Sequence, residues 1–130
     1  KTYALIAFLL FLLSLAFIVK YISNLQKLAF LANGIKYMRK YVEVDSVGIS
    51  IIQLSIKGEV EFSTISKLTN KPHLSKIQNE RNKNKLLNEI NLKIKVLTGS
   101  NHDFLIFSKS SFDRRYKVVS VNKSAFKKML

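Results

Sequence analysis

The chain begins with an uninterrupted apolar run. Residues 3–19 read YALIAFLLFLLSLAFIV, in which Ser14 is the one hydrophilic residue. As a helix rising 1.5 Å per residue, this run spans about 25 Å, near the lower limit for a hydrocarbon core of roughly 30 Å. Tyr3 and Tyr21 flank it as interfacial anchors. The pattern predicts a transmembrane helix over residues 1–22. Its lipid-facing or subunit-facing side chains are expected to be Tyr3, Leu5, Phe8, Leu9, Leu12, Leu13, Phe17 and Tyr21.

Two other structures compete for an apolar run of this length. A secretory signal peptide has an apolar core nearly as long, but no small-residue cleavage site follows Val19. A buried core helix that is apolar on every face needs a larger protein around it than the rest of this chain supplies. A membrane span is therefore the prediction.

Positive charge around the run bears on its orientation. Lys1 alone precedes the run, whereas five basic residues follow it: Lys20, Lys27, Lys36, Arg39 and Lys40. By the positive-inside rule the soluble domain faces the cytoplasm, matrix or stroma. A basic leader ahead of residue 1 would reverse the count, so the extracytoplasmic side stays open.

After the run, apolar residues recur at helical spacing. Leu25, Leu28, Ala32 and Ile35 are separated by three, four and three positions, with polar residues between them. The spacing predicts an amphipathic helix over residues 23–42, with Asn33-Gly34 as a cap or a kink. We expect this stripe to pack on the chain's own domain. A coiled-coil seam is the alternative.

Residues 43–130 predict a small soluble domain. Residues 48–56 are β-branched and apolar, and residues 57–59 resemble a hairpin turn before a return strand at 60–63. Strict alternation predicts a strand over residues 90–96, and residues 104–107 and 116–121 predict two more. Residues 73–89 fit a short helix or a mobile loop, and Ser124 is a candidate cap for a last helical turn.

The expected fold class is therefore α+β. A long N-terminal membrane-spanning helix continues into an amphipathic helix, which packs on a small, mainly antiparallel β-sheet. No internal repeat or low-complexity linker divides the chain.

The chain is strongly basic and contains no cysteine. Twenty-two Lys and Arg face eight Asp and Glu, which gives a formal net charge of +14. The abundance of Lys and Asn is typical of AT-rich coding sequence, so the charge is either compositional or functional. The absence of cysteine excludes disulfide frameworks, thiolate zinc sites and cysteine nucleophiles.

Basic residues are densest near the C-terminus. Residues 109–128 hold seven Lys and Arg against a single acid, with Phe112, Tyr116 and Phe126 interleaved. Cations with aromatic rings suit single-stranded nucleic acid, and they equally suit an anionic bilayer. A solvated sheet face is the alternative without a partner. The residues expected to contact an anionic partner are Arg114, Arg115, Lys117, Lys127 and Lys128.

Catalytic signatures are nearly absent from the sequence. It contains no glycine-rich phosphate loop, no HExxH and no EF-hand spacing. His73 and His102 lie in polar, turn-like stretches. We therefore expect no enzymatic activity, no cofactor, no metal site and no small-molecule substrate.

The order of the predicted elements resembles the type IV pilin and pseudopilin family. The apolar start KTYALIAFLLFLLSLAFIV, the amphipathic continuation and the sheet carry the resemblance. It implies a half-helix that anchors the subunit in the membrane and then packs in a filament core. Pilins typically begin with Phe or Met and carry Glu at the fifth position, where this chain has Lys1 and Leu5. The resemblance therefore implies a minor, initiating or tip-type subunit. The order also looks like that of inner-membrane platform proteins of pilus and type II secretion machines.

The sequence predicts a non-catalytic, single-pass membrane subunit of a larger assembly. Its partners are expected to be the bilayer and other membrane-protein subunits, either copies of itself or a larger complex. The most specific candidate is a pilin-like or secretion-platform component. An accessory subunit of a respiratory-type complex and a membrane-tethered binder of nucleic acid or anionic lipid are the alternatives.

Overall fold

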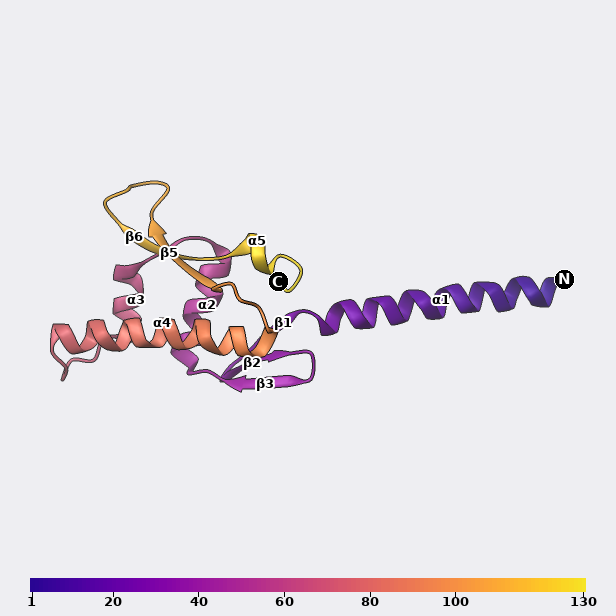
Figure 1. Cartoon of the computed structure of the whole chain (residues 1–130), viewed down its shortest axis with the longest axis horizontal. Helices are drawn as coiled ribbons and strands as arrows, with labels where there is room; N and C mark the ends of the chain where they lie inside the picture. Colours follow the sequence, from indigo (N-terminus) through magenta and orange to yellow (C-terminus); the bar gives the residue numbers. More distant parts are fainter.

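Helix α1 (Thr2–Leu25) projects away from the rest of the chain (Figure 1). The computed structural model describes all 130 residues, Lys1–Leu130, and none of the residues of α1 is buried. The helix is long and apolar enough to cross a membrane. The predicted N-terminal helix is therefore confirmed, and α1 is a candidate membrane span by its length and composition.

The residues after α1 form strands instead of the predicted amphipathic helix. Strands β1 (Leu28–Leu31), β2 (Gly34–Tyr37) and β3 (Lys40–Glu43) make an antiparallel sheet in sequence order. The prediction of a helix over residues 23–42 is wrong beyond Leu25 because Asn33 lies in a β-turn. The ring of Tyr41 crosses Gly34, where any Cβ atom would overlap it.

The predicted packing stripe is only partly placed as expected. Leu28 and Ile35 are buried in the chain's own core, in agreement with the prediction. Leu25 is half-buried at the end of α1, and Ala32 is exposed in the β1–β2 turn. Burial of Leu28 and Ile35 therefore comes from strand pairing and not from a helix face.

Two segments predicted as strands are helices. Helix α2 (Ser46–Lys57) replaces the strand expected at 48–56, and helix α4 (Lys76–Thr98) includes the one expected at 90–96. Asp45 caps α2 by accepting a hydrogen bond from the Val47 amide. Ser75 and Gln78 form a capping box at the start of α4, and Gly99 ends it with φ of 71°. These caps satisfy the free backbone groups at the helix ends.

Between α2 and α4 the chain forms a two-residue strand and a short helix. Strand β4 (Val60–Glu61) is shorter than the return strand expected at 60–63, and helix α3 (Phe62–Thr69) follows it directly. A six-residue connection, Asn70 to Ser75, then leads into α4.

The last two predicted strands are confirmed. Strands β5 (Leu105–Lys109) and β6 (Lys117–Val121) form an antiparallel hairpin, and β4 pairs with β6 to give the order β4-β6-β5. Helix α5 (Lys123–Phe126) follows, but its cap is Asn122, which accepts from the Ala125 amide, and not Ser124.

The hydrophobic core is centred on the buried face of α4. Leu87, Ile90, Ile94 and Leu97 lie at helical spacing and are buried. Helices α2 and α3 and strands β2, β3 and β5 pack against α4. Phe104 and Phe126 pack edge to face, with ring centroids 5.1 Å apart, and so join α5 to this core.

A buried asparagine connects α4 to the β5–β6 hairpin. The Asn91 amide nitrogen donates to the Leu105 carbonyl at 3.1 Å, and the Asn91 side-chain oxygen accepts from the Leu105 amide at 2.7 Å. The asparagine therefore pairs both backbone groups at the start of β5, away from water.

We predict that replacing Asn91 by Leu destabilises the soluble domain by about 2–4 kcal/mol, because it leaves two buried backbone groups without a partner. Chemical denaturation of the full chain in detergent measures the change. The matched control is Asn88→Leu, on the exposed side of α4, for which we expect a change within about 0.5 kcal/mol. Equal effects of the two substitutions would contradict the role assigned to Asn91.

Candidate nucleic-acid interface

The connection between α3 and α4 is fixed by one asparagine. The side-chain oxygen of Asn79 accepts from the Lys71 amide at 3.0 Å, and its nitrogen donates to the carbonyl oxygens of Lys71 and Leu74. Helix α3 consequently lies across α4 near its N-terminal end (Figure 1). The two helices form a rigid helix–turn–helix unit whose second helix is the longer.

A buried lysine joins the two helices on their inner side. Lys83 is 3 % exposed, and its ammonium lies 3.0 Å from both Glu80 carboxylate oxygens and 3.2 Å from the Ser66 hydroxyl. The same ammonium stands 5.0 Å from the centre of the Phe62 ring. Lys83 is therefore a structural cation, unlike the exposed Arg81 on the same helix.

The outer side of α4 carries amide and cationic groups that point to solvent. The exposed residues Gln78, Arg81, Lys85 and Asn88 follow one another at intervals of three, four and three positions, so they share one face. Arg81 forms no ion pair, and Lys85 is 4.0 Å from Glu89 at an exposed site. This face, which we call the α4 polar face, has donors with no partner inside the protein.

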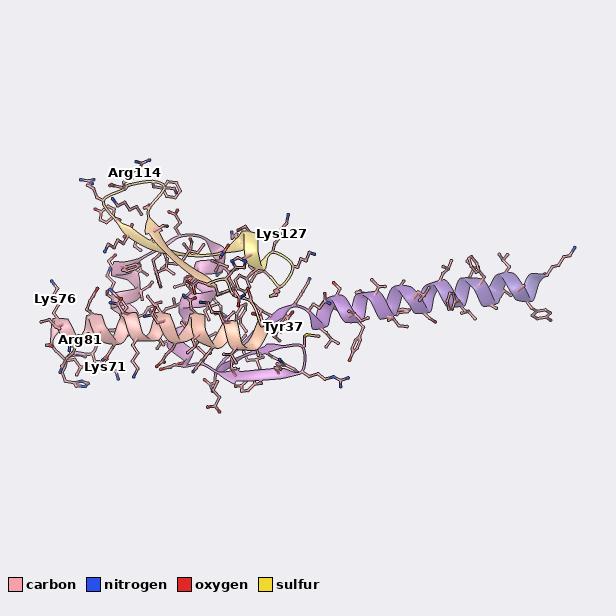
Figure 2. All side chains as sticks on the ribbon, viewed as in Figure 1. Tyr37, Lys71, Lys76, Arg81, Arg114 and Lys127 are labelled. Atoms are coloured by element: carbon pink, nitrogen blue, oxygen red, sulfur yellow. The ribbon has the colours of Figure 1, made fainter.

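The loop between β5 and β6 (residues 110–116) is ordered by internal hydrogen bonds. The Ser110 amide donates to the Tyr116 carbonyl at 2.8 Å, and the Ser110 hydroxyl accepts from the amide of Phe112. The Glu59 carboxylate accepts from the Ser110 hydroxyl and the Ser111 amide, which ties the loop to the residue before β4. The loop is a defined protrusion, visible at the top of Figure 2 around Arg114.

Two neighbouring arginines in this loop differ in availability. Arg115 makes a two-pronged ion pair with Asp113, with Nε–Oδ1 and Nη2–Oδ2 distances of 3.1 and 2.8 Å. These hydrogen bonds lower the pKa of Asp113 and raise the pKa of Arg115. Because the Asp113 pKa falls, the pair is complete above the ordinary carboxyl range and is lost only on acidification below it. Arg114 forms no ion pair and remains free at neutral pH.

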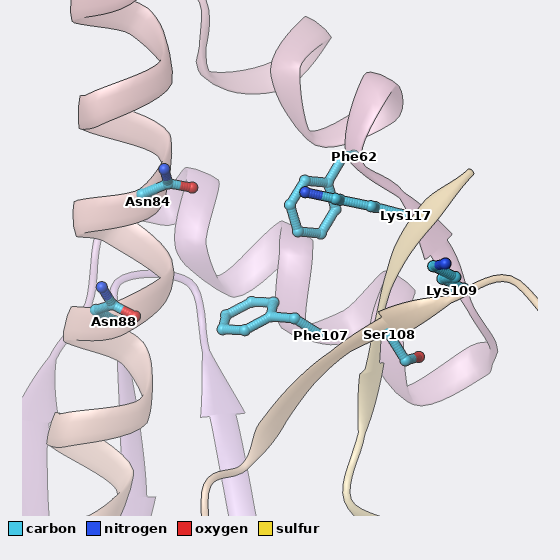
Figure 3. Close-up of a pocket in the computed structure, with 7 residues that line it drawn as sticks. All are labelled: Phe62, Asn84, Asn88, Phe107, Ser108, Lys109 and Lys117. Atoms are coloured by element: carbon cyan, nitrogen blue, oxygen red, sulfur yellow. The ribbon is translucent and has the colours of Figure 1, made fainter. Parts of the chain in front are cut away.

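A hollow of about 500 Å³ lies between α4 and the β5–β6 hairpin. Figure 3 shows Phe62 and Phe107 on its floor, Asn84 and Asn88 on the α4 side and Lys117 reaching across from the hairpin. The two rings meet edge to face, with centroids 6.0 Å apart. Cations and amides around an apolar floor can accept an anionic chain that passes from the helix to the hairpin.

Two lysines of like charge face each other at the end of this hairpin. Lys109 and Lys117 are paired in register, and both line the hollow. Like charges directly opposite on neighbouring strands destabilise the pair. No carboxylate forms an ion pair with either lysine. A bound anion would remove this repulsion.

The structure separates the residues predicted to share one anionic partner. Arg114, Arg115 and Lys117 lie on the β5–β6 hairpin, whereas Lys127 and Lys128 follow α5 at the end of the domain next to α1. Figure 2 shows Arg114 and Lys127 well apart. Lys127 and Lys128 therefore do not belong to the surface around the hairpin, and contact of these five residues with an anionic partner stays a prediction.

The sequence does not point to the α4 polar face, because residues 73–89 fit a short helix and a mobile loop equally well. The available signal was the capping box at Ser75 and Gln78, which marks a helix start. The predicted membrane helix residues lie on α1 and are all exposed. His73 and His102 are exposed, and no group of three or more His, Asp or Glu could hold a metal ion.

Comparisons of the chain with protein-family models, with curated proteins and with solved structures find no match.

We predict that Lys117→Glu raises the free energy of unfolding by up to about 1 kcal/mol, because it turns a repulsive cross-strand pair into an attractive one. Thermal or chemical denaturation of the full chain measures the effect. The control is Lys36→Glu on β2, whose strand partner is Tyr41 and not another cation. If both substitutions change stability equally, the lysine pair is not a source of strain.

Proposed function

We propose that the chain is a membrane-anchored protein that binds double-stranded DNA through α4 and the β5–β6 hairpin. The observation that carries the proposal is the exposed α4 polar face, on the second helix of a rigid helix–turn–helix unit and beside a basic hairpin. The sequence left open a membrane-tethered binder of nucleic acid as one alternative. The present proposal develops that alternative, but with duplex DNA instead of single strands as the ligand.

The arrangement of elements supports this proposal. The order α2-β4-α3-α4-β5-β6, with β4 paired to β6, is that of a winged helix–turn–helix domain. In helix–turn–helix proteins the second helix enters the major groove and its N-terminal residues contact base edges. Here the exposed side of the N-terminal half of α4 carries Arg81, which forms no ion pair. Strands β2 and β3 pack against α4 nearer its C-terminal end, where Lys93 donates to the Glu43 carbonyl.

The residue types on α4 suit the edges of base pairs. Arginine and lysine donate to guanine O6 and N7, and asparagine and glutamine pair with adenine N6 and N7. Arg81 and Lys85 provide the first kind of contact, and Asn88 provides the second. The free Arg114, with Lys109 and Lys117, is placed to contact phosphates along the adjoining backbone.

The shape of α4 favours duplex DNA over the other nucleic acids. A B-form major groove is about 12 Å wide and admits a helix, whereas the major groove of A-form RNA is too narrow for side chains to read. Single strands instead need stacking on exposed rings. Phe62 and Phe107 offer such rings at the floor of the hollow, so single-strand binding is an outcome that the experiment must distinguish.

Helix α1 supplies the anchor in this proposal. By the positive-inside rule, the excess of basic residues on its C-terminal flank favours the cytoplasm, matrix or stroma as the side of the domain. The resemblance to pilins loses part of its support, because strands replace the helical continuation after Leu25. A filament, secretion or respiratory assembly stays a prediction from sequence, and no contact in the structure favours it over DNA binding.

We predict that the full chain in neutral-lipid nanodiscs binds labelled duplex DNA with a strong dependence on salt. Replacing Lys109, Arg114 and Lys117 by Gln should weaken binding to all sequences alike. The log–log salt slope should then become shallower by about 2.7, because about 0.9 is lost for each phosphate contact. Fluorescence anisotropy at several salt concentrations measures the slope.

The matched control removes the same charge from the other end of the domain, by replacing Arg39, Lys127 and Lys128 with Gln. We expect this triple variant to keep the parent's slope. Equal losses in the two triple variants would show that net charge, and not this interface, attracts DNA. Tighter binding of single strands than of duplex would reject the placement of α4 in a major groove.

A further inference from the structure

The junction between α1 and the domain is short, and backbone hydrogen bonds flank it. Only Gln26 and Lys27 separate α1 from β1. The Met38 amide in the β2–β3 turn donates to the Leu25 carbonyl at 3.0 Å. The Leu28 amide donates to the Met129 carbonyl at 2.7 Å. The β2–β3 turn is therefore bonded to the last turn of α1, and the C-terminal segment is bonded to the start of β1.

The length of α1 sets the height of these two segments above a bilayer. The apolar run ends at Val19, and Lys20 is the first charged residue after it. From Lys20 to Leu25 the helix rises about 7.5 Å. The headgroup layer of one leaflet is about 5–8 Å thick. The segments bonded to Leu25 and Leu28 consequently lie at the outer edge of the headgroups.

The residues at this height are basic and not acidic. Residues 1–28, 38–41 and 122–130 contain no Asp or Glu. Arg39, Lys40, Lys127 and Lys128 are exposed and form no ion pair. Figure 2 shows Lys127 and Tyr37 at the end of the domain where α1 begins to project. Four cations that form no ion pair thus lie in or next to the segments bonded to Leu25 and Leu28, at the height where we expect lipid phosphates.

We propose that Arg39, Lys40, Lys127 and Lys128 form a headgroup-binding face that holds the domain against an anionic phospholipid surface. This inference rests on the proposed membrane anchoring by α1. The surface potential of an anionic leaflet attracts each nearby Lys or Arg and raises the equilibrium constant for binding roughly fivefold per residue.

The headgroup-binding face also fixes which end of α4 lies far from the membrane. The N-terminal end of α4 points away from α1 (Figure 1). The 23 residues of α4 extend about 34 Å.

The headgroup-binding face therefore separates the membrane from the DNA-binding end. Arg81 and Arg114 lie at the end of the domain opposite to α1 (Figure 2). Their separation from the bilayer exceeds the Debye length of about 8 Å at physiological ionic strength. The lipid charge is screened over that length, so an anionic membrane does not repel a duplex bound there.

Fluorescence quenching tests the inference on the full chain in nanodiscs. The chain has no cysteine, so Ser124→Cys on α5 and Ser111→Cys on the β5–β6 loop each accept one label. Lipids that carry a headgroup quencher should quench the label at residue 124 several times more than the label at residue 111. Adding about 30 % phosphatidylserine to phosphatidylcholine should increase quenching at residue 124, and salt should reverse the increase.

Two variants identify the groups responsible. Replacing Arg39, Lys40, Lys127 and Lys128 by Gln should abolish the effect of phosphatidylserine and leave duplex binding unchanged in neutral nanodiscs. The variant that lacks Lys109, Arg114 and Lys117 should keep the effect. An unchanged response to phosphatidylserine in the fourfold variant overturns the inference, as does equal quenching of the two labels.

Two further outcomes separate this inference from the proposals on which it depends. Loss of duplex binding in the fourfold variant, with its lipid response intact, would assign these cations to nucleic acid and overturn the inference. Failure of the chain to float with vesicles after carbonate extraction would reject the anchor itself, and the headgroup-binding face with it. If the chain does not bind duplex but does respond to phosphatidylserine, the proposed DNA binding is rejected and the headgroup-binding face is retained.

Discussion

Burial of one face of α4 is the constraint on which the rest of the domain depends. Leu87, Ile90, Ile94 and Leu97 form a continuous apolar stripe, and the elements on either side of α4 in the sequence pack against it. Asn91 lies within this stripe and pairs with the backbone of Leu105, so the hairpin is joined to the same face. Because one face of α4 is buried in the core, the opposite face remains accessible to solvent or a ligand.

The orientation of α4 separates the two surfaces that we propose for anionic partners. The C-terminal end of α4 lies near the sheet of β1 to β3 and the end of α1, and its N-terminal end lies at the far side of the domain. Basic residues gather at both ends, around Lys127 on one side and around Arg81 and Arg114 on the other. A continuous basic surface would make the bilayer and a nucleic acid compete for the same groups.

The ion pairs divide the basic residues into structural and available ones. Lys83 is buried against Glu80 and Ser66, and Arg115 is paired with Asp113. Arg81 and Arg114 have no such partner, although each is close in sequence to a paired cation. The composition alone cannot make this distinction, because it depends on which carboxylate the fold brings within reach. A high net charge is therefore a poor guide to the contact residues of this protein.

The sequence by itself determined those elements whose order of apolar and polar residues is compatible with only one secondary structure. Residues 3–19 are apolar on every face, so a helix that satisfies its own backbone is their stable form in lipid. Strands β5 and β6 could also be predicted, because they are short apolar segments on either side of a polar loop. The basic character of that hairpin followed directly from its residues.

Tertiary structure decided those elements whose order of apolar and polar residues is compatible with both a helix and a strand. Ile90 and Ile94 belong both to an alternating series with Leu92 and Val96 and to a helical series with Leu87 and Leu97. The fold buries the helical series and leaves Leu92 and Val96 62 % and 68 % exposed, because the caps at Ser75 and Gly99 extend one helix through both. After α1, the turn at Asn33 and the close approach of Tyr41 to Gly34 select strands over a helix. Only contacts between distant segments choose between such alternatives, and they also place Lys127 apart from Arg114.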